Sequence, residues 1–217
     1  MLLLIIIITA CNEKKINNPL NHKEFFKITK ELKGTILNIK NQKLSNPTGM
    51  IIMDSLLLID GESENHLMSI VDINQQKMIK RFLKKGKGPN ESIVADIYAY
   101  DNKHFYCYGK SLHRLFKYNL DSLIKHEAYM PEIIDLNDNG NFISAVGIND
   151  SLFIGTGKFK TGRYGLANRK GIIKTYFKFP NDGTDFSERL KSPAYGSELD
   201  IKPDKKKIVS SVNLGGV

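Results

Sequence analysis

The chain has 217 residues, of which 41% are hydrophobic and 25% are charged, a balance that excludes an intrinsically disordered protein and allows one domain with a sizeable core. Its formal net charge of +9 at pH 7 raises the question of a nucleic-acid partner. We expect none, because the lysines are spread along the whole chain and neither an arginine-rich helix nor an aromatic RNA-binding signature is present.

A dense apolar run, from Leu2 to Ala10, opens the chain and stops at Cys11. It is much shorter than the roughly 20 apolar residues that a helix needs to cross a bilayer. Its length and the small residues at its end fit a secretory signal peptide, which has an apolar region of about 7–15 residues before a cleavage site. We therefore expect residues 1–10 to be a signal peptide and the protein to be exported.

The residues "ITAC" at the end of this run resemble the lipobox of bacterial lipoproteins, in which a branched apolar residue and two small residues precede a diacylated cysteine. The resemblance implies that Cys11 carries the lipid that anchors the protein to a membrane, and that residues 11–24 form a polar tether. The alternative is a buried N-terminal strand with an ordinary core cysteine. With Cys11 acylated, Cys107 has no partner for an intramolecular disulfide.

Four stretches of the chain share a turn aspartate followed by an apolar or aromatic run; they cover residues 53–61, 100–109, 149–157 and 203–211. The aspartates recur about 50 residues apart, at Asp54, Asp101, Asp150 and Asp204. A period of about 40–50 residues with up to four short strands is typical of propeller blades. One such small sheet cannot bury both of its faces, so neighbouring blades must cover it.

Two further strands are expected after each of the first three stretches, separated by turn residues. They cover residues 66–73 and 77–83, 112–120 and 124–129, and 163–169 and 172–179. No amphipathic helical stretch lies between them, so the sequence predicts an all-β fold, a β-propeller of four-stranded antiparallel blades that spans residues 25–217. A β-sandwich is the alternative.

The predicted ring is incomplete. Six blades of this period need on the order of 300 residues, whereas this chain holds three full units and part of a fourth, about three and a half blades. Two explanations stay open: the sequence is a truncated product of a longer gene, or the half-ring closes by pairing with another chain. The final "NLGGV" is typical of a strand and turn within a blade, which favours truncation.

The segment "KKGKGPNES", residues 84–92, follows the last predicted strand of the first unit. Its glycines allow backbone angles closed to other residues, its proline fixes its own φ, and its glutamate can accept N–H bonds within the turn. We interpret it as a connector between blades; the alternative is an anion-binding nest formed by the glycine amides and the lysine. The residues concerned are Gly86, Lys87, Gly88, Pro89 and Glu91.

This segment resembles the Gly-basic-Gly-Pro-x-Glu motif that ends an early blade in the TolB-like six-bladed β-propeller lipoproteins of Bacteroidetes. The order around it is also similar, from the lipobox through an extended segment at residues 33–44 to residues 95–123, and the likeness is good over residues 11–123. Asn90 stands where the family usually has glycine, and Ser92 where an aromatic residue is common. The resemblance implies an outer-membrane lipoprotein that faces the periplasm or the cell surface.

The segment "DLNDNGNF" matches the first half of a calcium loop, with Asp135, Asn137 and Asn139 as candidate ligands. The twelfth position is Val146, so the bidentate carboxylate of such a loop is missing. An Asx-rich turn between blades is therefore the favoured interpretation. The five histidines show no zinc-binding spacing, and we expect no cofactor.

No nucleophile elbow is present, and in the strand predicted around His104 we expect Cys107 to be a core residue and the histidine to be half-buried. An enzyme should concentrate His, Arg and carboxylates on the innermost strands; those expected there, residues 55–60 and 151–157, carry almost none. We therefore predict a lipid-anchored binding or interaction scaffold of the cell envelope, with an envelope protein or a glycan at the channel mouth. An envelope lyase or hydrolase acting on a carbohydrate or lactone is the alternative.

Overall fold

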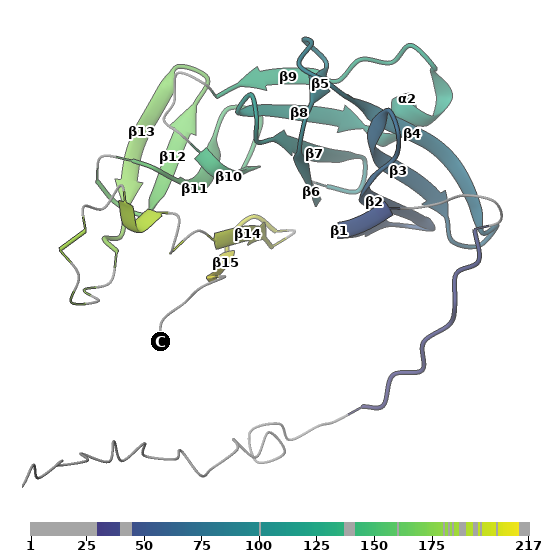
Figure 1. Cartoon of the computed structure of the whole chain (residues 1–217), viewed down its shortest axis with the longest axis horizontal. Helices are drawn as coiled ribbons and strands as arrows, with labels where there is room; N and C mark the ends of the chain where they lie inside the picture. Colours follow the sequence, from purple (N-terminus) through teal and green to yellow (C-terminus); the bar gives the residue numbers. More distant parts are fainter. Residues whose placement is uncertain are drawn as a thin grey trace, which may run out of the picture. The chain divides into compact units, whose positions relative to one another are not determined.

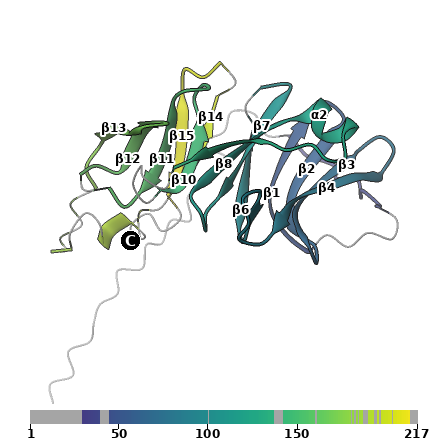
Figure 2. The same ribbon diagram turned by 90° about the horizontal axis from the view of Figure 1, so that it is seen from above.

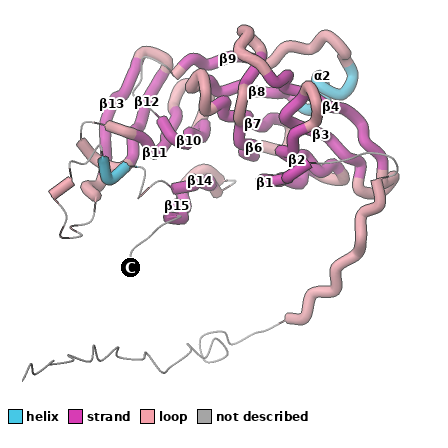
Figure 3. The backbone as a smooth tube through the Cα atoms, viewed as in Figure 1, coloured by secondary structure: helices cyan, strands magenta, loops and turns pink. Residues whose placement is uncertain are grey.

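The computed structural model describes residues 30–39, 45–99, 101–136, 142–159, 161–179, 181, 183, 185–186, 190–192, 195, 197–202 and 204–212. Strands dominate this part of the chain (Figure 1, Figure 3). The chain divides into two units, residues 1–36 and 37–217, and every strand of the described residues belongs to the second. The predicted signal peptide, the tether and Cys11 lie outside the described residues.

The first sheet contains, in spatial order, β1 (Ser45–Met53), β2 (Leu56–Glu62), β3 (His66–Asp72), β4 (Lys77–Lys85) and the very short β5 (Glu91–Ser92). Strands β1 to β4 pair antiparallel in a simple meander, and β5 adds to β4 in parallel. The middle strand β3 is buried at its five central positions, so both of its faces are covered.

The second sheet contains β6 (Ala95–Ala99), β7 (His104–Gly109), β8 (Arg114–Asn119) and β9 (Glu132–Asp135). The third contains β10 (Phe142–Gly147), β11 (Phe153–Gly157), β12 (Tyr164–Asn168) and β13 (Gly171–Tyr176), and the last pairs β14 (Ser197–Ile201) with β15 (Ile208–Val212). All pairs in these sheets are antiparallel meanders. The prediction of a partial propeller built from four-stranded antiparallel blades is confirmed.

The repeat aspartates mark the turn between the first and second strands of each sheet. Asp101 accepts backbone N–H groups two and three residues further on, both at 2.7 Å. Asp204 accepts one at 3.0 Å, whereas in the third sheet the neighbouring Asn149 takes this role at 2.9 Å, beside Asp150. Asp54 instead adopts the left-handed backbone that asparagine and aspartate tolerate in turns, with φ 54°. The repeat of about 50 residues in the sequence therefore corresponds to one sheet of the structure.

The strand predicted at residues 124–129 is wrong, because the chain there leaves the helix α2 (Leu120–Lys125) and crosses to β9. Asn119 caps this helix: its side chain accepts the backbone N–H three residues further on at 2.9 Å. Leu120 and Leu123 bury one apolar face of the helix. No helix of the described residues is long and apolar enough to cross a membrane.

The first strand of each sheet lies innermost, not the second. Strand β1 contacts β6, and β10 contacts β14, so the first strands of neighbouring sheets converge, while β4, β9 and β13 lie on the outer side (Figure 1). The prediction that residues 55–60 and 151–157 line the axis is therefore wrong, since they belong to β2 and β11. The inner strand precedes the turn aspartate, and in β6 it carries Asp96.

The first and second sheets lie side by side (Figure 2). Apolar side chains fill the space between them and the space between the second and third sheets. Between the first two, the Phe82 ring meets Phe105 and Tyr118 edge-on, with centroids 5.6 and 5.0 Å away. Between the second and third, the buried Tyr108 hydroxyl donates to the carbonyl of Phe142 at 2.8 Å. Burying one large apolar side chain contributes about 1.5–3 kcal/mol. The sheets therefore stabilise one another, as expected of propeller blades.

Candidate functional site

The connector between the first two sheets folds around its own glutamate. The Glu91 carboxylate accepts the N–H of Gly88 at 2.8 Å, and the N–H of Gly86 donates to the Ser92 carbonyl at 3.0 Å. A Cβ placed on Gly86 would lie 2.0 Å from Glu91 Oε2, and one on Gly88 would lie 2.9 Å from it. The carboxylate thus occupies the space beside the glycines that an external anion would need in a nest.

The same connector is tied to the second sheet. Ser92 is fully buried, and its hydroxyl donates to the carbonyl of Val94 at 2.8 Å. A Cβ placed on Gly109 of β7 would lie 2.8 Å from that hydroxyl, so a larger side chain at position 92 has no room here. Arg114 donates to the carbonyl of Pro89 at 3.4 Å. Lys87 is exposed at the tip of the loop.

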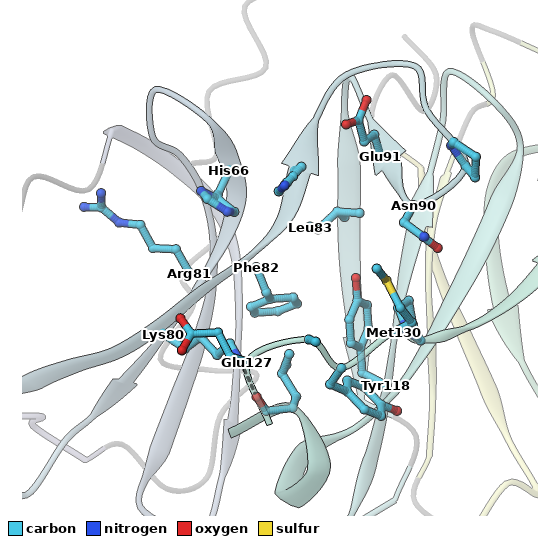
Figure 4. Close-up of a pocket in the computed structure, with 16 residues that line it drawn as sticks. His66, Lys80, Arg81, Phe82, Leu83, Asn90, Glu91, Tyr118, Glu127 and Met130 are labelled. Atoms are coloured by element: carbon cyan, nitrogen blue, oxygen red, sulfur yellow. Dashed lines mark hydrogen bonds between the residues drawn. The ribbon is translucent and has the colours of Figure 1, made fainter. Parts of the chain in front are cut away.

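A pocket of about 400 Å³ lies between the first two sheets, next to this connector (Figure 4). Its walls come from β4, from the connector and from the segment that follows α2. The larger apolar and aromatic side chains that line it are Phe82, Leu83, Tyr118, Leu123, Tyr129 and Met130. The charged or titratable ones are His66, Lys80, Arg81, Lys84, Glu91 and Glu127. The volume is in the range of small-molecule sites.

Lys80 fixes one wall of the pocket. Its ammonium group donates to the carbonyl oxygens of Leu123 and His126, each at 2.8 Å. Carbonyls at the C-terminal end of a helix lack partners within the helix and carry partial negative charge, so a lysine is well placed there. The bonds join the first sheet to the second and hold the segment that carries Glu127 and Tyr129.

His66, Lys84 and Glu91 lie in one row across β3, β4 and β5. The register pairs His66 with Lys84 and Lys84 with Glu91, and side chains paired directly across neighbouring strands start about 4.5–5.5 Å apart. Burial, followed by the positive charges of Lys84 and Arg81, lowers the pKa of His66. The imidazole is therefore neutral at pH 7 and lies in a positive electrostatic potential.

The backbone of the pocket wall is strained at Leu83. This buried residue of β4 has a φ of 54°, in the left-handed region that side chains other than glycine, asparagine and aspartate avoid. Holding a residue there costs on the order of 1–3 kcal/mol, and such strain is concentrated at sites with a function. The strained residue lies between Phe82, on the pocket floor, and Lys84, on its rim.

A second polar cluster joins the inner strands. Asp96 of β6 forms an ion pair with Lys110 at 2.9 Å and accepts the Tyr98 hydroxyl at 3.1 Å. The same hydroxyl lies 2.8 Å from Ser144 Oγ on β10. Asp60 is buried and accepts backbone N–H groups at the bulge of β1. Tyr98 therefore links the second sheet to the third, whereas the hydrogen bonds of Asp60, on β2, lie within the first sheet.

The described residues offer no metal site and no activated thiol. No group of three or more His, Cys, Asp and Glu in the part that the structure describes lies close enough together to hold a metal ion. Cys107 is a free, fully buried thiol; burial and then the negative charges of Asp60 and Asp96 raise its pKa well above the ordinary value. Cys107 is therefore a core residue. Because only a thiolate is a good nucleophile, the raised pKa also makes this thiol unreactive.

The calcium and lipidation hypotheses remain predictions. Asp135 ends β9, and its carboxylate lies 3.5 Å from Nε of Arg114. Asn137 and Asn139, the other two candidate calcium ligands, lie outside the described residues. The same holds for Cys11.

The pocket was not predicted from the sequence. His66 and Lys84 are brought together only by the register of the β3–β4 hairpin. Lys84 lies outside the strand predicted at residues 77–83, and the register shift in β3 could not be predicted from the sequence. Glu127 and Tyr129 lie at the pocket because they directly follow α2. The sequence predicts a strand at residues 124–129, so this placement could not be expected. The motif of residues 84–92 contributes Lys84, Pro89, Asn90 and Glu91 to the pocket wall, but its sequence is interpreted as a connector between blades.

Comparisons with known proteins agree with the architecture. Residues 24–213 match a family model described as TolB-like 6-blade propeller-like. A solved structure of a Bacteroides fragilis protein described as exported matches with a TM-score of 0.52 and 14% identity, over 81% of this chain and 52% of that one. A member of the DUF4221 family from Bacteroides vulgatus gives a TM-score of 0.45 and 15% identity, over 80% and 54%. This chain thus spans about half the length of those structures. A comparison with curated proteins found no match.

Proposed function

Because this chain belongs to the TolB-like 6-blade propeller-like family, we propose that it is an exported, lipid-anchored propeller that binds a ligand of the cell envelope without converting it. The N-terminal apolar run that ends at Cys11 supports export and anchoring. The Bacteroides fragilis structure with the same fold is described as an exported protein, which agrees with this location.

The observation that carries the binding function is the pocket between the first two sheets. It combines an apolar floor with a charged rim, the composition expected of a site that recognises a small molecule or one group of a larger one. Its walls are rigid, because Lys80 joins β4 to the end of α2 and the connector closes on Glu91. A preformed site of this kind loses little entropy when a ligand binds.

Binding is favoured over catalysis because two of the potentially reactive side chains, Asp96 and Cys107, are engaged or buried. Asp96 is engaged by Lys110 and Tyr98, so it is held in an ion pair and a hydrogen bond between strands. Cys107 is buried with a raised pKa. Neither group provides the activated nucleophile or the positioned general base that a lyase or hydrolase needs.

The test compares the full-length protein with a variant whose pocket is filled. Ala128 is exposed on the pocket wall, so Ala128→Trp should block the pocket without disturbing the core. Ser151→Trp, in the exposed turn before β11, is the matched control. We expect polysaccharide or peptide fractions of the cell envelope to raise the melting temperature of the parent and of the control, but not of the blocked variant.

Two outcomes would contradict this proposal. If no fraction changes the melting temperature of the parent, or if Ala128→Trp responds as the parent does, the pocket is not the binding site. Chromatography of each fraction before and after incubation tests for turnover. New products that form with the parent would establish the enzyme alternative instead.

A further inference from the structure

We propose that the pocket between the first two sheets binds a sugar ring that carries a carboxylate, of the uronic-acid class, with the carboxylate held between His66 and Lys84. This inference rests on the proposed binding function and specifies its ligand. Figure 4 shows His66 at the rim, with Phe82 on the floor of the same pocket.

The expected position of the ligand carboxylate follows from the cross-strand pair of His66 and Lys84. His66 and Lys84 are directly opposite each other on β3 and β4, and among the described residues none forms an ion pair with the Lys84 ammonium or a hydrogen bond with the His66 ring. The nearby Glu91 carboxylate is turned toward Gly88. An anion that enters between the two side chains would gain a charge-assisted hydrogen bond from each once the imidazole is protonated.

The number of charges on the ligand is limited by the acidic residues at the same rim. Glu91 and Glu127 both line the pocket, and Lys80 is already committed to two carbonyl oxygens. Arg81 adds one further positive charge near His66. A ligand with two or more negative charges would meet repulsion from these carboxylates at short range. A single carboxylate with several hydroxyl groups fits better, because hydroxyl groups can donate hydrogen bonds to Glu127 and to the side-chain oxygen of Asn90.

The apolar floor of the pocket is the reason to expect a sugar ring in the ligand. Phe82 and Tyr129 present aromatic surface to the pocket, and Met130 adds a thioether side chain that is 62% exposed. Tyr129 is held in place because its hydroxyl accepts the N–H of Asn119 at 3.0 Å. The C–H face of a sugar ring is apolar enough to be buried against such side chains. A bare carboxylate would leave this surface exposed to water.

The experiment titrates the full-length protein with D-glucuronate by isothermal calorimetry at pH 6, using D-glucose as the neutral ring and acetate as the bare carboxylate. We expect D-glucuronate to bind at least about tenfold more tightly than either of them, a difference of about 1.4 kcal/mol. His66→Gln and Lys84→Gln should each weaken that binding by about tenfold. Lys77→Gln removes the same charge from the far end of β4 and should leave it unchanged.

The pKa of His66 in the complex distinguishes a carboxylate bound between His66 and Lys84 from a general attraction of an anion to the positive charges of the protein. A carboxylate beside His66 raises the pKa of the imidazole, which burial, Lys84 and Arg81 lower in the free protein. Binding is then coupled to proton uptake. At pH values above the pKa of the ligand carboxyl, about 3–4, the affinity falls as the pH rises from the pKa of His66 in the free protein to its higher pKa in the complex. The ring proton signals of His66 should show this raised pKa in NMR titrations with D-glucuronate.

The outcomes distinguish this inference from the proposed function. If acetate or D-glucose binds as tightly as D-glucuronate, or if either pocket variant binds D-glucuronate as the parent does, the ligand assignment is wrong. If only an acidic peptide fraction raises the melting temperature and Ala128→Trp abolishes that effect, the inference fails while the binding function stands. If neither D-glucuronate nor any envelope fraction binds, both fail.

Discussion

At the scale of single residues, side-chain carboxylates and amides define the turns of the sheets, and Asp101 is the clearest case. Its Oδ1 accepts two backbone N–H groups at 2.7 Å and lies 3.0 Å from the ring of His104. We expect Asp101→Ala to lower the free energy of unfolding by about 1 kcal/mol, since it removes these bonds from an exposed turn. Urea unfolding of both proteins measures the difference.

The effect of Asp101→Ala should depend on pH. Burial alone would raise the pKa of Asp101, but hydrogen bonds from Lys103 and His104 hold it below its ordinary value. A carboxyl group with a lowered folded-state pKa stabilises the protein above its unfolded-state pKa, and that contribution is lost as the pH falls through the folded-state pKa. The difference between the two proteins should therefore shrink as the pH falls below the ordinary pKa of aspartate, about 3.9, and through the lower pKa of folded Asp101. A difference that is constant from pH 2 to pH 7 would rule out this role for the charge.

Cys107 offers a second prediction at this scale. Because the thiol is fully buried and burial raises its pKa, a thiol reagent should not modify it in the folded protein. In a Cys11→Ser background, which leaves Cys107 as the single cysteine of the chain, its alkylation should follow unfolding as urea is increased. Mass spectrometry measures the extent of labelling. Rapid modification in buffer without urea would show that the thiol is reachable in the native state.

At the scale of the elements, the strands that follow the turn aspartates were predictable, whereas the strands before them and α2 were not. The apolar runs after Asp54 and Asp101 are strong patterns, and both form strands. The innermost strand β1 contains Gly49 and the exposed Met50 and Ile52, so its pattern does not indicate a buried strand. Helix α2 has only six residues, too few to show a helical period.

The connector loop gives a prediction for an element. Gly86→Ala would place a methyl group against the Glu91 carboxylate, and we expect a loss of about 1–3 kcal/mol in stability. In the double variant Gly86→Ala/Glu91→Ala the obstructing carboxylate is absent, so the two losses should be less than additive. Urea unfolding of the four proteins completes this cycle. Strict additivity would mean that Gly86 is needed for another reason, such as its backbone angles.

At the scale of the whole molecule, hydrogen bonds between neighbouring sheets supplement the apolar contacts. Tyr98 reaches from the second sheet to Ser144 of the third, and the Thr156 hydroxyl donates to the backbone carbonyl of Ser197 in the last at 3.1 Å. Buried polar groups of this kind specify one arrangement, because another packing would leave them without partners. The repeat of the sequence could predict the sheets, but such contacts depend on side chains far apart in the chain.

The attachment of the protein to a membrane is the last prediction. If Cys11 carries two acyl chains, the mature protein should sediment with the membrane fraction, because two chains give stable anchoring whereas one gives only marginal binding. Cys11→Ser should move the protein to the soluble fraction, and the melting temperature should stay the same, since the strands all belong to the unit of residues 37–217. Immunoblotting of the two fractions measures the distribution, with Cys107→Ala as the control that keeps the anchor. If Cys11→Ser remains in the membrane fraction and mass spectrometry shows that residues 1–10 have been removed, the lipid anchor is disproved, because a bound partner must then hold the protein there.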